Sequence, residues 1–224
     1  MSELSPLLIS LQVSILATVL VLITALPIAW FVTSKSKVPV FWDCLFSMPM
    51  VLPPTVVGFL LLISFGNRSP LGLFLKNIGL PMIFSLRGAI LASAVVSFPL
   101  LYRSGRAAFD QMNFATLACA RTLGVSELKI FFCLLIPEIS PAVLSGLVLT
   151  FCRALGEFGA TSLIAGNIPG VTQTMSLAIY TAVSNNDFQA AYRWSFYLIL
   201  FSILLMLFSE LFLRRYKRRE QRLK

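Results

Sequence analysis

Long apolar runs alternate along the chain with short polar segments. A helix needs about 20 mostly apolar residues to cross a bilayer. The predicted spans are residues 7–32, 41–65, 86–108, 130–155 and 192–213. Two further apolar segments, 66–85 and 156–187, are interrupted too often to span. The pattern therefore predicts an all-α polytopic membrane protein with five transmembrane helices.

The second span contains a stretch, L-P-P-T-V-V-G, in which helical regularity should weaken. Proline lacks a backbone donor, and helix breaks inside a membrane persist only where other groups satisfy the freed carbonyls. A broken helix at membrane depth can offer backbone groups to a substrate or act as a hinge. The alternative is an ordinary proline kink packed against a neighbouring helix. The candidate pathway or gate residues in this stretch are Pro53, Pro54, Thr55 and Gly58.

The polar segment between the third and fourth spans, residues 113–137, carries the signals of two helices with a forced stop between them. Asn113 can cap the first helix, and Gly124 stands where a left-handed residue would end it. Ser126 can cap the next helix. Pro137 follows about three turns later and is expected to bend that helix.

Composition supports the membrane assignment. Hydrophobic residues make up 58% of the chain, against about 45–50% apolar residues in soluble domains. Lys and Arg outnumber Asp and Glu by 18 to 9, which can indicate nucleic-acid binding. Here the densest basic run, residues 214–224, directly follows an apolar helix. The basic excess therefore indicates cytoplasmic segments beside a lipid bilayer, not a nucleic-acid partner.

The distribution of the basic residues predicts the orientation in the membrane. They gather at residues 35–37, around 103–129 and in the C-terminal tail, while the alternate loops hold few. Because cytoplasmic segments are enriched in Lys and Arg, the N-terminus is expected outside and the tail in the cytoplasm. The first apolar run lacks a basic n-region and is too long for a signal peptide, so a retained helix is expected. Residues 1–224 are expected to form a single membrane domain.

Several kinds of chemistry are absent from the sequence. It contains no histidine, no C-x-x-C pair among its four cysteines and no P-loop motif for ATP. No catalytic residue, metal ligand or bound cofactor is therefore predicted. An ion-coupled carrier or integral-membrane enzyme remains an alternative class, and would require carboxylates within the spans. Only Glu138, Glu157 and Glu210 come near, each close to a predicted helix end.

The stretch R-A-L-G-E-F-G-A-T, residues 153–161, lies near the outer end of the fourth span. Ionisable residues at membrane depth are functional candidates. Arg153 and Glu157 are four residues apart and can pair on one helix face, although their order is the less favourable one and Gly156 can interrupt the helix. A structural ion pair and a gate or binding-protein contact both remain open. The candidate site residues here are Arg153, Glu157 and Thr161.

Residues 113–137 resemble the cytoplasmic loop of type I ABC importer permeases. The motif of that family is E-A-A, three residues, G, nine residues, then I-x-L-P. In this sequence Ala118-Cys119-Ala120 stand at the E-A-A positions, with Gly124 and Leu134 to Pro137 at the expected offsets. Ala118 replaces the glutamate, so a polar contact made through that glutamate is not carried over.

The resemblance implies the type I ABC importer permease fold, with a cytoplasmic coupling helix that docks in a cleft of an ATPase subunit. The residues assigned to this coupling surface are Phe114, Leu117, Ala118, Cys119, Ala120, Arg121, Leu123, Gly124, Val125 and Pro137. Four of them are expected to be exposed and to form the apolar contact: Phe114, Leu117, Leu123 and Val125. The alternative is that these four pack against the protein's own helices.

Four stretches together are similar to the molybdate permease branch of that family: L-P-P-T-V-V-G, A-R-T-L-G, R-A-L-G-E-F-G-A-T and N-I-P-G-V-T-Q-T. The resemblance implies the non-enzymatic permease subunit of a bacterial inner-membrane molybdate importer, with tungstate as a second cargo. It also implies a homodimer, two cytoplasmic ATPase subunits that bind ATP and Mg, and a periplasmic oxyanion-binding protein. A sulfate or thiosulfate permease is the alternative within the family, because sulfate permeases are similar through the loop and R-A-L-G-E.

Overall fold

The computed structural model describes residues 5–112 and 114–223, and every regular element among them is a helix. The elements are α1 (Ser5–Ser34), α2 (Pro39–Val51), α3 (Pro54–Phe65), α4 (Pro70–Asn77), α5 (Leu86–Asp110), α6 (Phe114–Thr122), α7 (Glu127–Ile130), a π-helical turn (Phe131–Leu135), α8 (Ile136–Leu155), α9 (Gly159–Ile164), α10 (Met175–Ser184) and α11 (Phe188–Leu223).

Four helices in the described part of the chain are long and apolar enough to cross a membrane. They are α1, α5, the stretch Phe132–Leu155 that includes α8, and the stretch Phe188–Leu211 of α11. The bent pair α2 and α3 makes a fifth span if the two are counted together. The predicted class, an all-α polytopic membrane protein, is confirmed.

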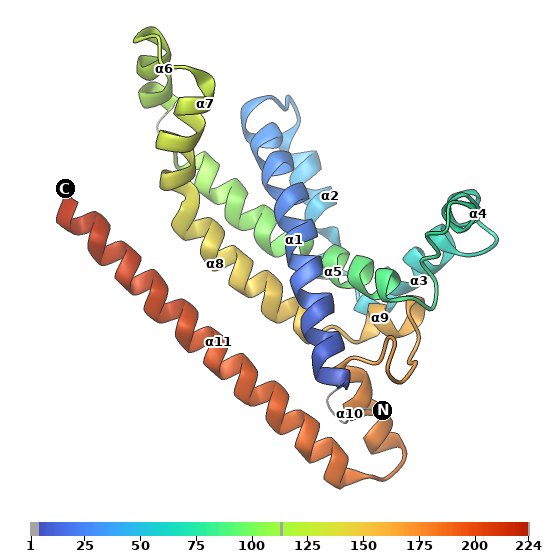
Figure 1. The fold of residues 1–224 in the computed structure, drawn as a ribbon. Helices are drawn as coiled ribbons and strands as arrows, with labels where there is room; N and C mark the ends of the chain where they lie inside the picture. The colour runs from blue at the N-terminus through green and yellow to red at the C-terminus, as the bar shows by residue number, and fades with distance from the viewer. Residues whose placement is uncertain (1–4, 113, 224) are drawn as a thin grey trace.

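The second predicted span, residues 41–65, is not one straight helix. Its two halves, α2 and α3, meet at an angle of 107°. Leu52, at the break, has an extended backbone with ψ 141°, the conformation favoured before proline. Pro53 and Pro54 follow it and cannot donate to the preceding turn. The helix therefore ends, and Figure 1 shows α3 leaving α2 sideways toward α4.

Small residues let the long helices approach closely. Ala17, Ala25 and Ala29 on α1 are fully buried, and α1 makes its most extensive contact with α5. On the other side of α5, a Cβ added to Gly146 of α8 would lie 2.7 Å from the Cβ of Ser104. Without a hydrophobic driving force in lipid, such close van der Waals packing is what holds membrane helices together.

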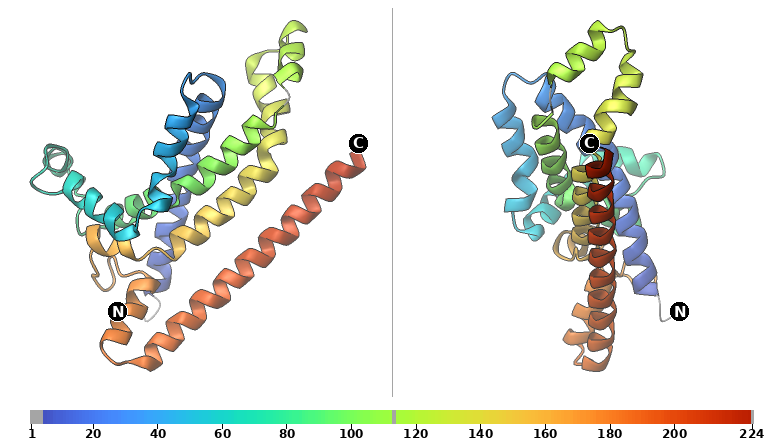
Figure 2. Two further views of the ribbon diagram at one scale, coloured as in Figure 1. Left: turned by 180° about the vertical axis from the view of Figure 1, so that it is seen from behind. Right: turned by 90° about the vertical axis from the view of Figure 1, so that its left-hand side faces the viewer.

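The two ends of the bundle carry different elements. The C-terminal ends of α1 and α5, the start of α2 and the hairpin of α6 and α7 lie toward one end, and α10 lies at the other (Figure 1). α11 runs along one side of the bundle and contacts α8 and α10 (Figure 2). The segments in which basic residues gather, around residues 35–37 and 103–129, thus lie toward the same end of the bundle (Figure 1).

α3 crosses α9 at very short range. A Cβ added to Gly58 of α3 would lie 2.7 Å from the Cα and 2.9 Å from the carbonyl oxygen of Ala160 in α9. No real Cβ sits this close to backbone, so any side chain at Gly58 must push the two helices apart. Gly58 is therefore required by the crossing itself.

Replacement of Gly58 by alanine should destabilise the protein by about 1–3 kcal/mol, because overpacking forces backbone shifts. Gly156→Ala is the matched control, because its added Cβ would meet only the carbonyl oxygen of Cys152, at 3.7 Å. Thermal unfolding of the detergent-solubilised chain measures both. Equal unfolding midpoints for the two variants would show that the close crossing of α3 and α9 is not needed for stability.

Candidate functional site

The hairpin Phe114–Ile130, formed by α6 and α7, has the predicted stop between its helices. Gly124 has φ +74°, and its N–H donates to the carbonyl of Arg121 at 3.0 Å. The Val125 N–H donates to the carbonyl of Ala120 at 3.1 Å. This pair of bonds is a Schellman motif, which satisfies the last carbonyls of α6 and requires a left-handed residue. The predicted role of Gly124 as helix terminator is confirmed.

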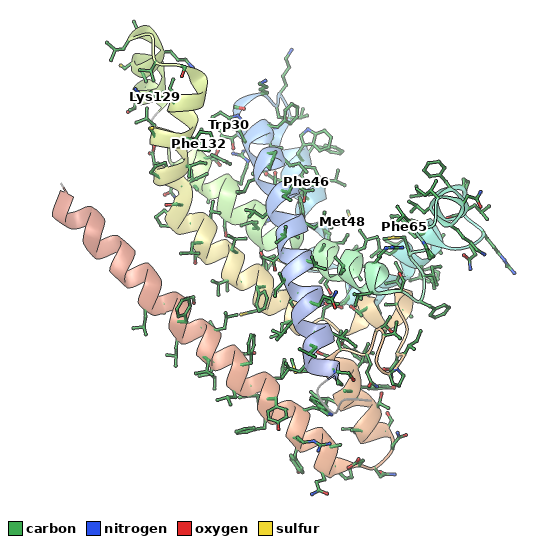
Figure 3. All side chains as sticks on the ribbon, viewed as in Figure 1. Trp30, Phe46, Met48, Phe65, Lys129 and Phe132 are labelled. Atoms are coloured by element: carbon green, nitrogen blue, oxygen red, sulfur yellow. The ribbon has the colours of Figure 1, made fainter. Side chains whose placement is uncertain are left out.

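The second helix of the hairpin also begins as predicted. The Ser126 Oγ accepts a hydrogen bond of 3.4 Å from the Lys129 N–H, and its carbonyl accepts one of 2.9 Å from the Ile130 N–H. Asn113 and the side chain of Phe114 lie outside the described part of the chain. Figure 3 shows Lys129 and Phe132 on the hairpin side of the molecule, far from Phe65 at the end of α3.

The hairpin presents only part of the predicted coupling surface. Leu123 is 82% exposed. Four other residues of the predicted surface are also exposed: Ala118, Cys119, Arg121 and Gly124.

Leu117, by contrast, is 3% exposed, and both it and Ala120 belong to the core that includes Phe109 and Ile130. Val125 packs against the same core. The expectation that Leu117 and Val125 are exposed was wrong, because the hairpin must itself bury an apolar face to pack against the end of the bundle.

Pro137 lies at the start of α8, directly after the π-helical turn Phe131–Leu135. A proline has no N–H for the preceding turn, and its ring conflicts with the carbonyl four residues earlier. A single wider turn relieves that conflict, and such turns are frequent at functional sites. Pro137 was expected to bend the helix; what the structure shows is the π-helical turn just before it, where the hairpin joins α8.

Arg153 and Glu157 form the ion pair that their spacing predicts. Arg153 Nη1 lies 2.6 Å from Glu157 Oε2, and the side chain of Glu157 is only 1% exposed, against 35% for Arg153. α8 ends at Leu155, so the pair spans the end of the helix. Glu157 Oε1 accepts a second bond of 2.8 Å from the Ala160 N–H at the start of α9. The buried carboxylate thus joins the end of one helix to the start of another.

The crossing of α3 and α9 brings together the two candidate stretches of the sequence analysis, the one around Pro53 and Pro54 and the one that follows Arg153. A Cβ on Gly159 would lie 3.1 Å from the Cβ of Pro54 and 3.3 Å from the backbone nitrogen of Thr55. Gly58 faces Ala160, as described above. Pro53 and Thr55 are exposed on the crossing, whereas Thr161 is fully buried. We call the two stretches, residues 53–58 and 153–161, the crossing site.

A polar network that the sequence analysis missed joins three helices near the hairpin. Arg106 of α5 donates from Nε to Asp43 Oδ1 at 3.3 Å and from Nη1 to Thr33 Oγ1 at 2.8 Å. Arg106 also pairs with Asp110, one turn later in α5. The Tyr102 hydroxyl donates to Asp43 Oδ1 at 2.6 Å. The signal for this network was Asp43 itself, an acidic residue inside an otherwise apolar predicted span.

These features define a class of protein: a polytopic membrane protein with a helical hairpin at one end. Among the described residues no group of His, Cys, Asp and Glu is placed to hold a metal ion. Residues 15–218 match the family described as binding-protein-dependent transport system inner membrane component. The chain belongs to this family, and is therefore a multi-pass inner-membrane permease component of a transport system.

Curated relatives cover most of the chain. It is 42% identical over 180 residues to the molybdenum transport system permease protein ModB of Escherichia coli (strain K12), covering 79% of this chain and 78% of ModB. It is 37% identical over 224 residues to ModB of Haemophilus influenzae, covering 97% and 96%. The sulfate transport system permease protein CysT of Salmonella typhimurium is 32% identical over 203 residues, covering 90% and 73%.

The fold also matches a solved transporter. A chain from the inward-facing MetNI methionine ABC transporter superposes with a TM-score of 0.74 at 15% sequence identity. The match covers 96% of this chain and 99% of that chain. At this identity the likeness concerns the fold, which is that of a type I ABC importer permease.

The buried pair at the crossing site predicts an asymmetry between its two partners. Arg153→Gln leaves a buried carboxylate without its cation, whereas Glu157→Gln keeps an acceptor for the Ala160 N–H and leaves only a partly exposed arginine. Arg153→Gln should therefore be the more destabilising, by about 1–3 kcal/mol. Thermal unfolding of both variants and of the double variant measures the difference, and the double variant should recover most of the loss.

Uptake per folded molecule separates the two interpretations of this pair. Loss of a purely structural pair lowers only the amount of folded protein, whereas loss of a gate also changes uptake per folded molecule. A larger loss of stability for Glu157→Gln than for Arg153→Gln would contradict the burial argument.

Proposed function

We propose that this chain is the transmembrane subunit of an ATP-driven importer for molybdate, with tungstate as a second cargo. The observation that carries the proposal is the exposed face of the α6–α7 hairpin in a chain whose relatives include molybdenum permeases. The whole chain, residues 1–224, acts as one permease domain that alternates between outward and inward openings. Selectivity rests mainly on the binding protein, because Arg153 is the one basic residue assigned to the crossing site.

The chain works with other subunits. Two copies form the pathway, two cytoplasmic ATPase subunits supply the energy, and a periplasmic oxyanion-binding protein delivers the cargo. ATP and Mg bind to the ATPase subunits, so this chain carries no catalytic residue of its own. The absence of a P-loop motif from the sequence supports this division of labour.

The orientation follows from charge. The N-terminus lies outside and the C-terminus in the cytoplasm, which places the hairpin on the cytoplasmic face. There the apolar side chain of Leu123 and the open backbone at Gly124 offer a surface to an ATPase subunit. Closure of the ATPase subunits then becomes a rigid-body push on α5 and α8.

The crossing site is the gate of this pathway. α3 is a short helix set at an angle of 107° to α2 by the break at Pro53 and Pro54. It crosses α9 closely, with Gly58 against Ala160 and Gly159 against Pro54. Because the break separates the two helices, α3 can tilt without bending α2. Movement of α3 against α9 would open or close the outer end of the pathway beside Thr55 and the Arg153–Glu157 pair.

The docking role predicts a specific defect for Gly124→Val. The substitution places a branched side chain on the docking face at a left-handed position, and should abolish ATP-dependent uptake while the chain stays inserted. Gly79→Val is the matched control, since Gly79 has φ +76° and, like Gly124, open space around an added Cβ among the described residues. Co-purification of the ATPase and uptake by cells measure the effect. Normal uptake by Gly124→Val would rule out the docking role.

The cargo is tested by competition. Cells that depend on this transporter should take up labelled molybdate, with unlabelled tungstate competing well and sulfate competing at least about tenfold less well. The 32% identity to CysT makes a sulfate permease the second candidate. Strong competition by sulfate with little by tungstate would favour that candidate.

A further inference from the structure

The Arg106 network joins α5 to the consecutive helices α1 and α2, whose contacting residues lie 73 and 63 residues earlier in the sequence. Its members are Thr33 of α1, Asp43 of α2, and Tyr102, Arg106 and Asp110 of α5. The side chain of Arg106 is 16% exposed and that of Asp43 is 35% exposed. Arg106 is therefore largely shielded by the protein, whereas Asp43 is partly accessible to water.

This setting makes separation of the three helices costly. A charge at membrane depth needs a partner, and removing one member of a shielded pair leaves the other uncompensated. If α2 moved away from α5, Asp43 would lose Arg106 and the Tyr102 hydroxyl together. If α1 moved away, Arg106 would lose the Thr33 hydroxyl. The ends of α1, α2 and α5 therefore move as one body.

Aromatic contacts reinforce the same body. The rings of Trp30 in α1 and Phe109 in α5 meet edge to face with centroids 5.1 Å apart. The rings of Phe46 in α2 and Tyr102 in α5 have centroids 5.2 Å apart. Figure 3 shows Trp30 and Phe46 on the end of the bundle nearer the hairpin. Aromatic pairs of this kind add stability beyond their buried area.

The network lies between the two parts of the candidate site. α5 ends at Asp110, so Arg106 lies about one turn before the end of that helix. Leu117 of α6 shares a buried core with Phe109 of α5, so a push on the hairpin reaches this end of α5. α2 carries Asp43 and ends at the break before Pro53, beyond which α3 crosses α9. A displacement of α5 is thus passed to α2 through Arg106 and Asp43, and from α2 to the crossing site.

We propose that Arg106 is a positioning residue that carries the movement of the coupling hairpin through Asp43 to α2, and so to the gate formed by α3 and α9. The inference rests on the proposed function, because it concerns how ATP hydrolysis by the partner is turned into opening of this chain. It adds a specific connection that neither the hairpin nor the crossing site contains. Breaking the connection should leave hydrolysis running while transport falls.

Two carboxylates provide a matched test. Asp43 and Asp110 both contact Arg106, but Asp43 belongs to another helix and Asp110 to the same one. Asp43→Asn and Asp110→Asn make the same chemical change, and only the first removes an ionic link between helices. Each variant is purified as the complete transporter and reconstituted in proteoliposomes with the binding protein. ATP hydrolysis, labelled molybdate uptake and the unfolding midpoint are then measured on the same preparation.

Asp43→Asn should lower uptake per ATP hydrolysed about tenfold, whereas Asp110→Asn should stay within about twofold of the unaltered transporter. Asp43→Glu, which keeps the charge, should recover most of the ratio. The inference is overturned if the two Asn variants lower the ratio equally. It is also overturned if Asp43→Asn lowers hydrolysis and uptake in proportion to its loss of stability, which is the signature of a merely structural role.

If the Asp43→Asn variant does not accumulate in the membrane, Thr33→Val tests the same connection. This variant removes one neutral hydrogen bond to Arg106 and should lower the same ratio about twofold. An unchanged ratio would overturn the inference. An unaltered transporter that takes up no oxyanion with ATP would refute the proposed function itself, so the two failures are distinguishable.

Discussion

Inside a bilayer a broken helix survives only where the rest of the protein covers the break, and the arrangement of α3 depends on this constraint. Pro53 and Pro54 end α2, and the chain turns through 107° into α3. α9 packs against one side of α3 directly after the break, so closely that glycine is required at Gly58, while Pro53 and Thr55 stay exposed. The break and its cover come from stretches about 100 residues apart. The tertiary structure therefore brings α9 beside the break between α2 and α3.

The helices α1, α5 and α8, together with the start of α2, form a closely packed body by contrast. α1, α5 and α8 pack through alanine, glycine and serine, and the Arg106 network ties α1 and α2 to α5. Under the proposed function, this closely packed body would carry the force applied at the hairpin, and displacement would appear at the break between α2 and α3.

The absence of a dense cationic site along the crossing fits a conduit that must release its cargo. The carboxylate of Glu157 is already engaged by Arg153 and by the Ala160 N–H. An oxyanion that met this pair would compete with an existing buried interaction. Under the proposed function, weak and transient contact with the cargo is then expected, and tight recognition would be left to the binding protein.

Much of the fold followed from local pattern. Apolar length predicted the spans, Gly124 and Ser126 predicted the ends of the hairpin helices, and the spacing of Arg153 and Glu157 predicted their pairing. These features depend on residues a few positions apart, where backbone geometry alone decides which groups meet. Only the tertiary structure decided that Leu117 is buried and that Asp43 meets Arg106. The physical reason is that both depend on how separate helices pack, and a periodic pattern states which faces are apolar without stating which neighbour covers them.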